Sequence, residues 1–183
     1  MKSIILFGYM CAGKTTVGRN LAKSLGFNFY DLDWYIEDRY HKRIPEIFAE
    51  QGEEMFRNLE RRMLHEVAQF ENIVLACGGG TPCFSDNVDF ANQCGTTVYL
   101  KASPHTIVQH LKLSHTVRPL LKNKQGQELY DFITSQLAER EPYYEKAQLT
   151  FNVDVLDSFD KINGLVNHIT EVLIAHDHGK MEN

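Results

Sequence analysis

The stretch "GYMCAGKTT", residues 8–16, follows the apolar run "IILF" near the start of the chain and decides the expected fold. A glycine, four residues and then Gly13-Lys14-Thr15 form the spacing of a phosphate-binding loop. Such a loop joins a strand to a helix, and both are predicted here. The preceding run is apolar and short, and apolar residues recur every four positions in the stretch that follows. The spacing therefore predicts a nucleoside triphosphate site, but it does not identify the group that receives the phosphate.

Each part of this loop has a chemical reason. Gly8 and Gly13 let successive backbone N–H groups turn toward phosphate oxygens, and the helix that begins near Lys14 adds its positive end. The Lys14 ammonium can reach the outer phosphates of ATP, and the Thr15 hydroxyl can ligate Mg²⁺. We expect further nucleotide contacts from other residues of the loop, among which Cys11 contributes mainly its backbone: Met10, Cys11, Ala12 and Thr16.

Strand-length apolar runs alternate with segments of helical period along the rest of the chain. Strands are predicted at residues 3–7, 27–33, 72–77, 96–103 and 149–153. Helices are predicted from Lys14, at 53–70, 103–110, 127–137 and after Ser158, which could cap the last one. This alternation predicts an α/β fold: a five-stranded parallel sheet with helices on both faces.

Composition narrows the class of protein. At 183 residues we expect one domain over residues 1–176, followed by a disordered polar tail at 177–183. The net charge of −5 argues against a general nucleic-acid binder, and the apolar run near the N-terminus is too short to enter a membrane. The four cysteines lack metal-ligand spacing, so we expect free thiols in a reducing cytoplasm. We expect the chain to act as a monomer.

Two carboxylates, Asp31 and Asp33, follow the second predicted strand. One could hold Mg²⁺ through water while the other positions an acceptor hydroxyl and takes its proton. The alternative is that either side chain simply caps the following helix.

A run of three glycines, residues 78–80, follows the third predicted strand. Such a run permits close approach of a ligand to the backbone, although an ordinary turn would also use it. Three arginines are scattered further along: Arg57 on an amphipathic helix, Arg118 in a weakly periodic stretch, and Arg140 near a helix end. Any one of them alone would be interpreted as a surface residue.

Together these segments resemble shikimate kinases. The match runs from the phosphate loop and "YDLDWYIE" through "FRNLE" and "LACGGG" to "TVRPLL" and "AEREPYYEKA", in order over residues 4–155. The combination is far more specific than the loop alone. The resemblance implies a P-loop kinase three-layer sandwich that transfers the γ-phosphate of ATP to the 3-hydroxyl of shikimate with Mg²⁺. It also implies a shikimate-binding segment at about 33–62 and a lid at about 112–126.

The resemblance also implies residue roles. Lys14 would contact the outer phosphates, while Thr15 and Asp31 would hold Mg²⁺. Asp33 would bind the acceptor hydroxyl, and Arg118 would arrive with the lid over the transferring phosphate. The shikimate contacts would come from Asp33, the paired arginines Arg57 and Arg140, and the backbone of Gly79 and Gly80. An anionic acceptor suits this set because guanidinium groups bind carboxylates through two parallel hydrogen bonds.

Several positions depart from the family pattern. Cys77 stands where a threonine or serine is common, and Arg43 occupies a place where a small residue is expected. An arginine that commonly stacks on adenine is absent near Leu111 and Lys112, and no proline follows Pro142. Alternatives at this point are a kinase of another hydroxy acid such as gluconate, a nucleoside monophosphate kinase, and a nucleotide-binding switch or inactive module.

Overall fold

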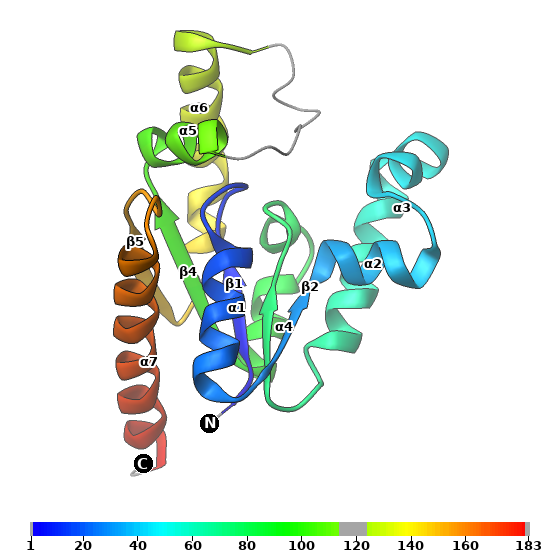
Figure 1. Ribbon diagram of the computed structural model, residues 1–183. Helices are drawn as coiled ribbons and strands as arrows, with labels where there is room; N and C mark the ends of the chain where they lie inside the picture. Colours follow the sequence, from blue (N-terminus) through cyan, green and yellow to red (C-terminus); the bar gives the residue numbers. More distant parts are fainter. Residues whose placement is uncertain (1, 114–123, 182–183) are drawn as a thin grey trace.

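The computed structural model describes residues 2–113 and 124–181. Its centre is a parallel sheet of five strands in the order β2-β3-β1-β4-β5 (Figure 1). The strands are β1 (Ile4–Phe7), β2 (Asn28–Asp31), β3 (Ile73–Ala76), β4 (Thr96–Ala102) and β5 (Leu149–Val153). Each falls within a run that the apolar pattern predicts. β1 and β3 are entirely buried, as strands covered on both faces should be.

Helices cover both faces of the sheet. The described helices are α1 (Lys14–Leu25), α2 (Leu32–Tyr40), α3 (Ile44–Val67), η1 (Thr81–Cys83, a 3₁₀ turn), α4 (Asn87–Cys94), α5 (Pro104–Leu113), α6 (Gly126–Tyr144) and α7 (Phe159–Met181). α1 and α7 pack side by side on one face (Figure 1). Right-handed crossovers from β2 to β3, β3 to β4 and β4 to β5 put the helices of those connections on the opposite face. The predicted three-layer α/β architecture is confirmed.

The strand order places three loops together. The connection from β1 runs to β2 at one edge of the sheet, whereas the connection from β3 runs to β4 in the other direction. The chain therefore leaves these two neighbouring strands on opposite faces of the sheet. Ligands of open α/β sheets bind at the carboxyl ends of strands at such a switch point. Here those ends carry residues 8–13 after β1 and residues 77–80 after β3, with Asp31 at the end of β2.

The structure differs from the sequence-based expectations at several helices. α2 begins at Leu32, so the predicted second strand is cut short and Asp33 lies in a helical first turn. α3 begins nine residues earlier than predicted, because its first part and the expected amphipathic part are joined across a kink at Gly52, which has φ +77°. α6 continues beyond the predicted end and includes Pro142.

The C-terminal segment also differs from the expectation. α7 runs to Met181, so the described part of the polar tail expected to be disordered at 177–183 continues the helix, and no proline interrupts it. Ser158 caps this helix as predicted, with its Oγ accepting from the Lys161 N–H at 3.4 Å. The expected lid at 112–126 begins and ends at helix termini. Its residues 114–123, with Arg118 among them, lie outside the described residues.

All four cysteines are free thiols, as expected. Within residues 2–113 and 124–181, no helix combines the length and apolar character that crossing a membrane requires.

Candidate active site

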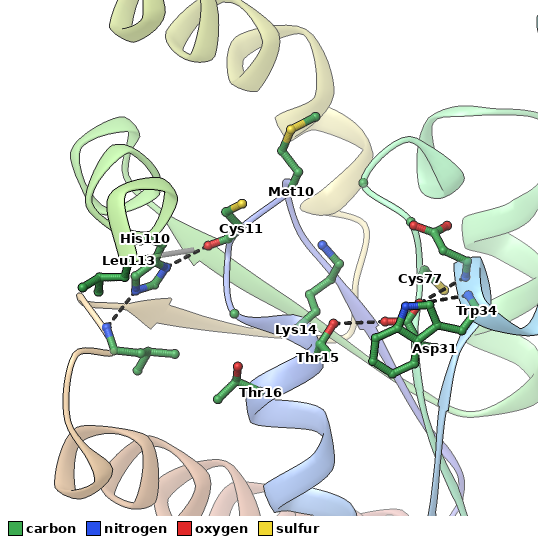
Figure 2. A pocket seen from close by; sticks show the side chains of 15 residues that line it. Met10, Cys11, Lys14, Thr15, Thr16, Asp31, Trp34, Cys77, His110 and Leu113 are labelled. Carbon is green, nitrogen blue, oxygen red and sulfur yellow. Dashed lines mark hydrogen bonds between the residues drawn. The ribbon is translucent and has the colours of Figure 1, made fainter. Parts of the chain in front are cut away.

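A cavity of about 490 Å³ opens at the carboxyl edge of the sheet (Figure 2). Residues of the predicted phosphate loop line one side, and Asp31, Asp33 and Trp34 line another. The chain after β3 contributes Cys77, Gly78 and Gly79, and His110, Leu113 and Leu156 also line the cavity. The structure therefore brings together the three strand-end features that the sequence analysis singled out.

The phosphate loop adopts the conformation that its glycines predict. Gly8 has φ +145° and Gly13 has φ +95°, values that residues with a side chain rarely adopt. A Cβ at Gly8 would lie 2.7 Å from the carbonyl oxygen of Leu100. Gly13 precedes α1 and provides no side-chain cap, so the first N–H groups of that helix point into the cavity without a protein acceptor from the capping position. An anion is the natural partner for such a helix terminus.

Lys14 is held under the loop. Its Nζ donates to the carbonyl oxygens of Gly8 at 2.8 Å and Tyr9 at 2.9 Å. Burial lowers the pKa of Lys14, while Asp33 and Asp31 act in the opposite direction. The Lys14 ammonium therefore lies at the phosphate loop, and both of its hydrogen-bond acceptors are backbone carbonyl oxygens of that loop.

Asp31 caps the following helix, one of the two alternatives weighed for it, and also contacts Thr15. Its Oδ2 accepts from the Thr15 hydroxyl at 3.0 Å (Figure 2). Its Oδ1 caps α2 by accepting from the N–H groups of Asp33 at 3.2 Å and Trp34 at 3.5 Å. The cap orients the Asp31 carboxylate so that its Oδ2 contacts Thr15 in the first turn of α1.

Asp33 lies against the first glycine of the run after β3. A Cβ built at Gly78 would stand 2.9 Å from Asp33 Oδ1 and 3.0 Å from the Thr81 hydroxyl. The family resemblance implied roles for Gly79 and Gly80, but Gly78 is the glycine of this run whose missing side chain leaves room for the Asp33 carboxylate.

Arg57 approaches the same glycine run from α3. A Cβ at Gly80 would lie 2.8 Å from its Nη2 and 2.9 Å from its Nη1. The guanidinium also stands over the ring of Phe84 at 4.1 Å. Its Nη1 donates to the buried carboxylate of Glu60 at 2.8 Å, and its Nε is buried without a hydrogen-bond partner in the described part of the chain. Glu60 thus holds the Nη1 of Arg57, while its Nε is still able to donate a hydrogen bond.

Glu60 is a buried carboxylate beside the glycine run that was not predicted from the sequence. Its side chain is 1% exposed and also accepts from the Thr81 hydroxyl at 2.6 Å. A buried carboxylate needs a paired charge, and Arg57 supplies it. A glutamate three residues after an arginine, within the apolar stripe of an amphipathic helix, is the signal that could have identified the pair.

Arg140 lies on α6 and, like Arg57, is not among the described residues that line the cavity. Its Nη2 donates to Gln136 Oε1 at 2.8 Å, and its guanidinium stands 5.5 Å from the ring centre of Tyr9. One turn later, the Tyr144 hydroxyl donates to the carbonyl oxygen of Gly79, which ties α6 to the glycine run. This contact was also not predicted, since nothing in the local pattern pairs residues so far apart.

The positive charges of both arginines act on Cys83. Burial raises the pKa of its thiol, and the positive charges of Arg140 and Arg57 both act to lower it. A second thiol, Cys77, lines the cavity beside the phosphate loop. Burial raises the pKa of Cys77 well above its usual value, so this side chain is neutral and does not oppose an anion.

Mg²⁺ would find only a partial set of ligands here. In residues 2–113 and 124–181 no three His, Cys, Asp or Glu side chains are grouped so as to hold a metal ion. The Thr15 hydroxyl and the Asp31 carboxylate are two side-chain oxygens that meet beside the phosphate loop. That is the donor set Mg²⁺ uses when nucleotide phosphates and water complete its shell.

Comparison with known proteins identifies the family. The shikimate kinase family model matches residues 10–173. The chain belongs to the shikimate kinase family. A shikimate kinase of Parabacteroides distasonis is 50% identical over 94% of this chain and 100% of its own length. Membership of the shikimate kinase family makes this chain an ATP-dependent kinase of shikimate and rules out the gluconate and nucleoside monophosphate alternatives.

Two solved shikimate kinases have the same fold. The crystal structure of the Bacteroides thetaiotaomicron enzyme superimposes with a TM-score of 0.91 at 48% identity, covering 94% of this chain and 98% of that one. The Acinetobacter baumannii enzyme in complex with shikimate gives a TM-score of 0.83 at 34% identity, covering 96% and 94%.

Proposed function

We propose that this chain transfers the γ-phosphate of ATP to the 3-hydroxyl of shikimate with Asp33 as the residue that accepts the hydroxyl proton. The observation that supports the proposal is that Asp33 lies in one cavity with the phosphate loop and against the glycine run that Arg57 also contacts. Asp33 and Lys14 line one cavity, and Arg57 touches the glycine run that contacts Asp33.

The donor side consists of residues 8–16. Backbone N–H groups and the terminus of α1 bind the phosphates of ATP, and the Lys14 ammonium stabilises charge on the outer phosphates as the transfer proceeds. Met10, Cys11, Ala12 and Thr16 complete the loop. Arg118 would add a second cation over the transferring phosphate.

Thr15 and Asp31 would hold Mg²⁺, Asp31 acting through water. The bound ion supplies charge neutralisation on the phosphate oxygens. The hydrogen bond between the two side chains supports this proposal because it brings their oxygens together, and the α2 cap keeps Asp31 in this orientation.

The acceptor side binds an anion that carries hydroxyl groups. Arg57 and Arg140 would pair with the shikimate carboxylate. The Nε of Arg57, which has no partner among the described residues, is a donor that a carboxylate oxygen can satisfy. Gly79 and Gly80 would allow the ring to approach the backbone. The 3-hydroxyl oxygen then attacks the γ-phosphorus as its proton passes to Asp33, and the bond from phosphorus to the β–γ bridging oxygen breaks to release ADP.

We further propose that the protein works as a monomer in the cytoplasm. Lys14 of the donor side and Asp33 of the acceptor side line the same cavity. The free thiols suit a reducing compartment.

An acceptor panel tests the proposed function. Purified protein is incubated with ATP and Mg²⁺ in the presence of shikimate, gluconate, a nucleoside monophosphate or no acceptor, and ADP is measured. We expect ADP above the blank with shikimate, and ³¹P spectra that place the phosphate on the 3-hydroxyl. A Lys14→Met preparation excludes contaminating kinases. Turnover with another acceptor and none with shikimate would contradict the proposal.

A further inference from the structure

His110, on α5, joins two segments that lie on either side of the nucleotide end of the cavity. Its Nδ1 is 2.7 Å from the carbonyl oxygen of Cys11 in the phosphate loop. Its Nε2 is 2.7 Å from the backbone nitrogen of Leu156, in the segment between β5 and α7 (Figure 2). These partners are 99 and 46 residues away in the sequence, so one side chain ties three distant parts of the chain together.

The partners fix the protonation of the imidazole. A carbonyl oxygen can only accept a hydrogen bond, so Nδ1 must carry a proton toward Cys11. A backbone N–H can only donate, so Nε2 must be unprotonated toward Leu156. His110 is therefore a neutral imidazole with its proton on Nδ1, and it satisfies both contacts only in this form.

The contact with Cys11 fixes the orientation of a peptide group in the phosphate loop. Cys11 has φ +60°, in the left-handed region that side chains disfavour. The peptide bond between Cys11 and Ala12 is trans, so its C=O and N–H point in opposite directions. Because His110 holds the Cys11 carbonyl toward α5, the N–H of Ala12 points away from α5. That N–H donates to the Tyr9 carbonyl oxygen at 3.1 Å, within the turn of the loop. The imidazole thus stabilises a strained loop conformation from outside.

The contact of His110 with Leu156 acts on the other end of the phosphate loop, at Gly13. A Cβ at Gly13 would lie only 2.8 Å from Leu156 Cδ1, so the leucine side chain rests directly on the residue that precedes α1. His110 holds the backbone N–H of that same leucine. The loop is consequently contacted at Cys11 by the imidazole and at Gly13 by the side chain that the imidazole positions.

We propose that His110 is a positioning residue for the nucleotide: it preorganises residues 8–13 and Leu156 for ATP and sets the affinity for ATP rather than the rate of phosphate transfer. The inference rests on the proposed binding of ATP at the loop. Its physical basis is that a loop held in its bound shape before binding loses less conformational freedom when the ligand arrives.

The first experiment measures the tautomer without any assay of activity. A long-range ¹H–¹⁵N spectrum of the full chain at neutral pH distinguishes the two neutral tautomers and the imidazolium of each histidine, and His110→Gln assigns the signal. We expect the neutral form protonated at Nδ1. A neutral ring protonated at Nε2, or an imidazolium, would overturn the proposal because neither can make both bonds.

The second experiment uses variants that keep one contact each. In His110→Asn the amide nitrogen can replace Nδ1 as donor to Cys11, and in His110→Gln the amide oxygen can replace Nε2 as acceptor from Leu156. We expect the Kd and KM for ATP to rise about fivefold in each, and roughly 30-fold in His110→Leu, which loses both bonds. We expect kcat and the Kd for shikimate to stay at wild-type values.

The control is His105→Leu, which changes an exposed histidine in the first turn of the same helix and should leave both affinities unchanged. If His110→Leu fails to fold, the Asn and Gln variants decide. A lower kcat with unchanged ATP affinity, or wild-type ATP affinity in the Asn and Gln variants, would overturn the proposal. Failure of the wild-type protein to bind ATP would instead contradict the proposed function itself.

Discussion

The guanidinium of Arg57 occupies the space that a side chain at Gly80 would fill, with Nη2 at 2.8 Å and Nη1 at 2.9 Å from the position of the missing Cβ. Gly80 has φ −92°, so its backbone does not require glycine. The requirement is steric and comes from the arginine that we place against the shikimate carboxylate. Glu60 holds the other side of Arg57, so the guanidinium cannot move away freely.

Gly80→Ala should therefore weaken shikimate binding selectively. The added methyl group displaces Arg57, and we expect the KM for shikimate to rise about tenfold, the size of one lost charge-assisted hydrogen bond. The KM for ATP should not change. Gly164→Ala, in α7 with nothing within 4 Å of the added carbon, is the matched control and should only stabilise the helix, by about 0.5–1 kcal/mol. Equal effects on both substrates would contradict this account.

Lys14→Met should separate stability from catalysis. Burial disfavours the charged ammonium, which is why the pKa of Lys14 is lowered. We expect the melting temperature without ATP to stay at or above the wild-type value. Turnover should fall by at least about 100-fold because a cation at the outer phosphates is lost. The rise in melting temperature on adding ATP should shrink. Retained turnover in this variant would show that Lys14 does not act on the phosphates.

His65 should make the fold sensitive to mild acid. Its ring stacks on Phe90 at 3.6 Å, and its Nε2 is buried without a partner among residues 2–113 and 124–181. Burial lowers the pKa of His65, and Arg61 adds to this effect. The unfolded chain therefore binds a proton more readily than the folded one, so stability is lost as pH falls below the ordinary histidine pKa of about 6.5.

His65→Phe keeps a stacked ring and removes the titration. Urea unfolding at pH 5, 6 and 7 should show a smaller loss of unfolding free energy on acidification in this variant than in the wild type. His105→Leu, at an exposed position, should follow the wild type. An identical pH dependence in wild type and His65→Phe would exclude His65 as a source of the sensitivity.

Features that depend on residues close together in the chain could be predicted from the sequence. Loop spacing located residues 8–16, and apolar runs located all five strands, because both depend on neighbours in the chain. Asp31 shows a limit of a different kind. Capping was weighed as the alternative to holding Mg²⁺, but the cap uses one carboxylate oxygen and the other accepts from Thr15, so capping does not exclude that role.

Contacts between distant residues could not be predicted from periodicity. The clearest cases are the pairing of Glu60 with Thr81, the hydrogen bond from Tyr144 to Gly79, and the two bonds of His110. The crowding of Asp33 against Gly78 also depends on how β2 and β3 lie beside each other. The proposed roles of Arg57, Arg118 and Arg140 come from the family resemblance, because a single arginine in a sequence does not indicate a role.

The measurement that tests the account most directly is the kinetic effect of Asp33→Asn. Trp34, the single tryptophan, lies beside Asp33 and lines the cavity, so its fluorescence can report binding of ATP and of shikimate in both proteins. We expect wild-type affinity for ATP and a fall in kcat of about 100-fold or more, because the amide cannot accept the hydroxyl proton. Wild-type turnover in Asp33→Asn would contradict the account, since Asp33 would then be only a residue of the first turn of α2.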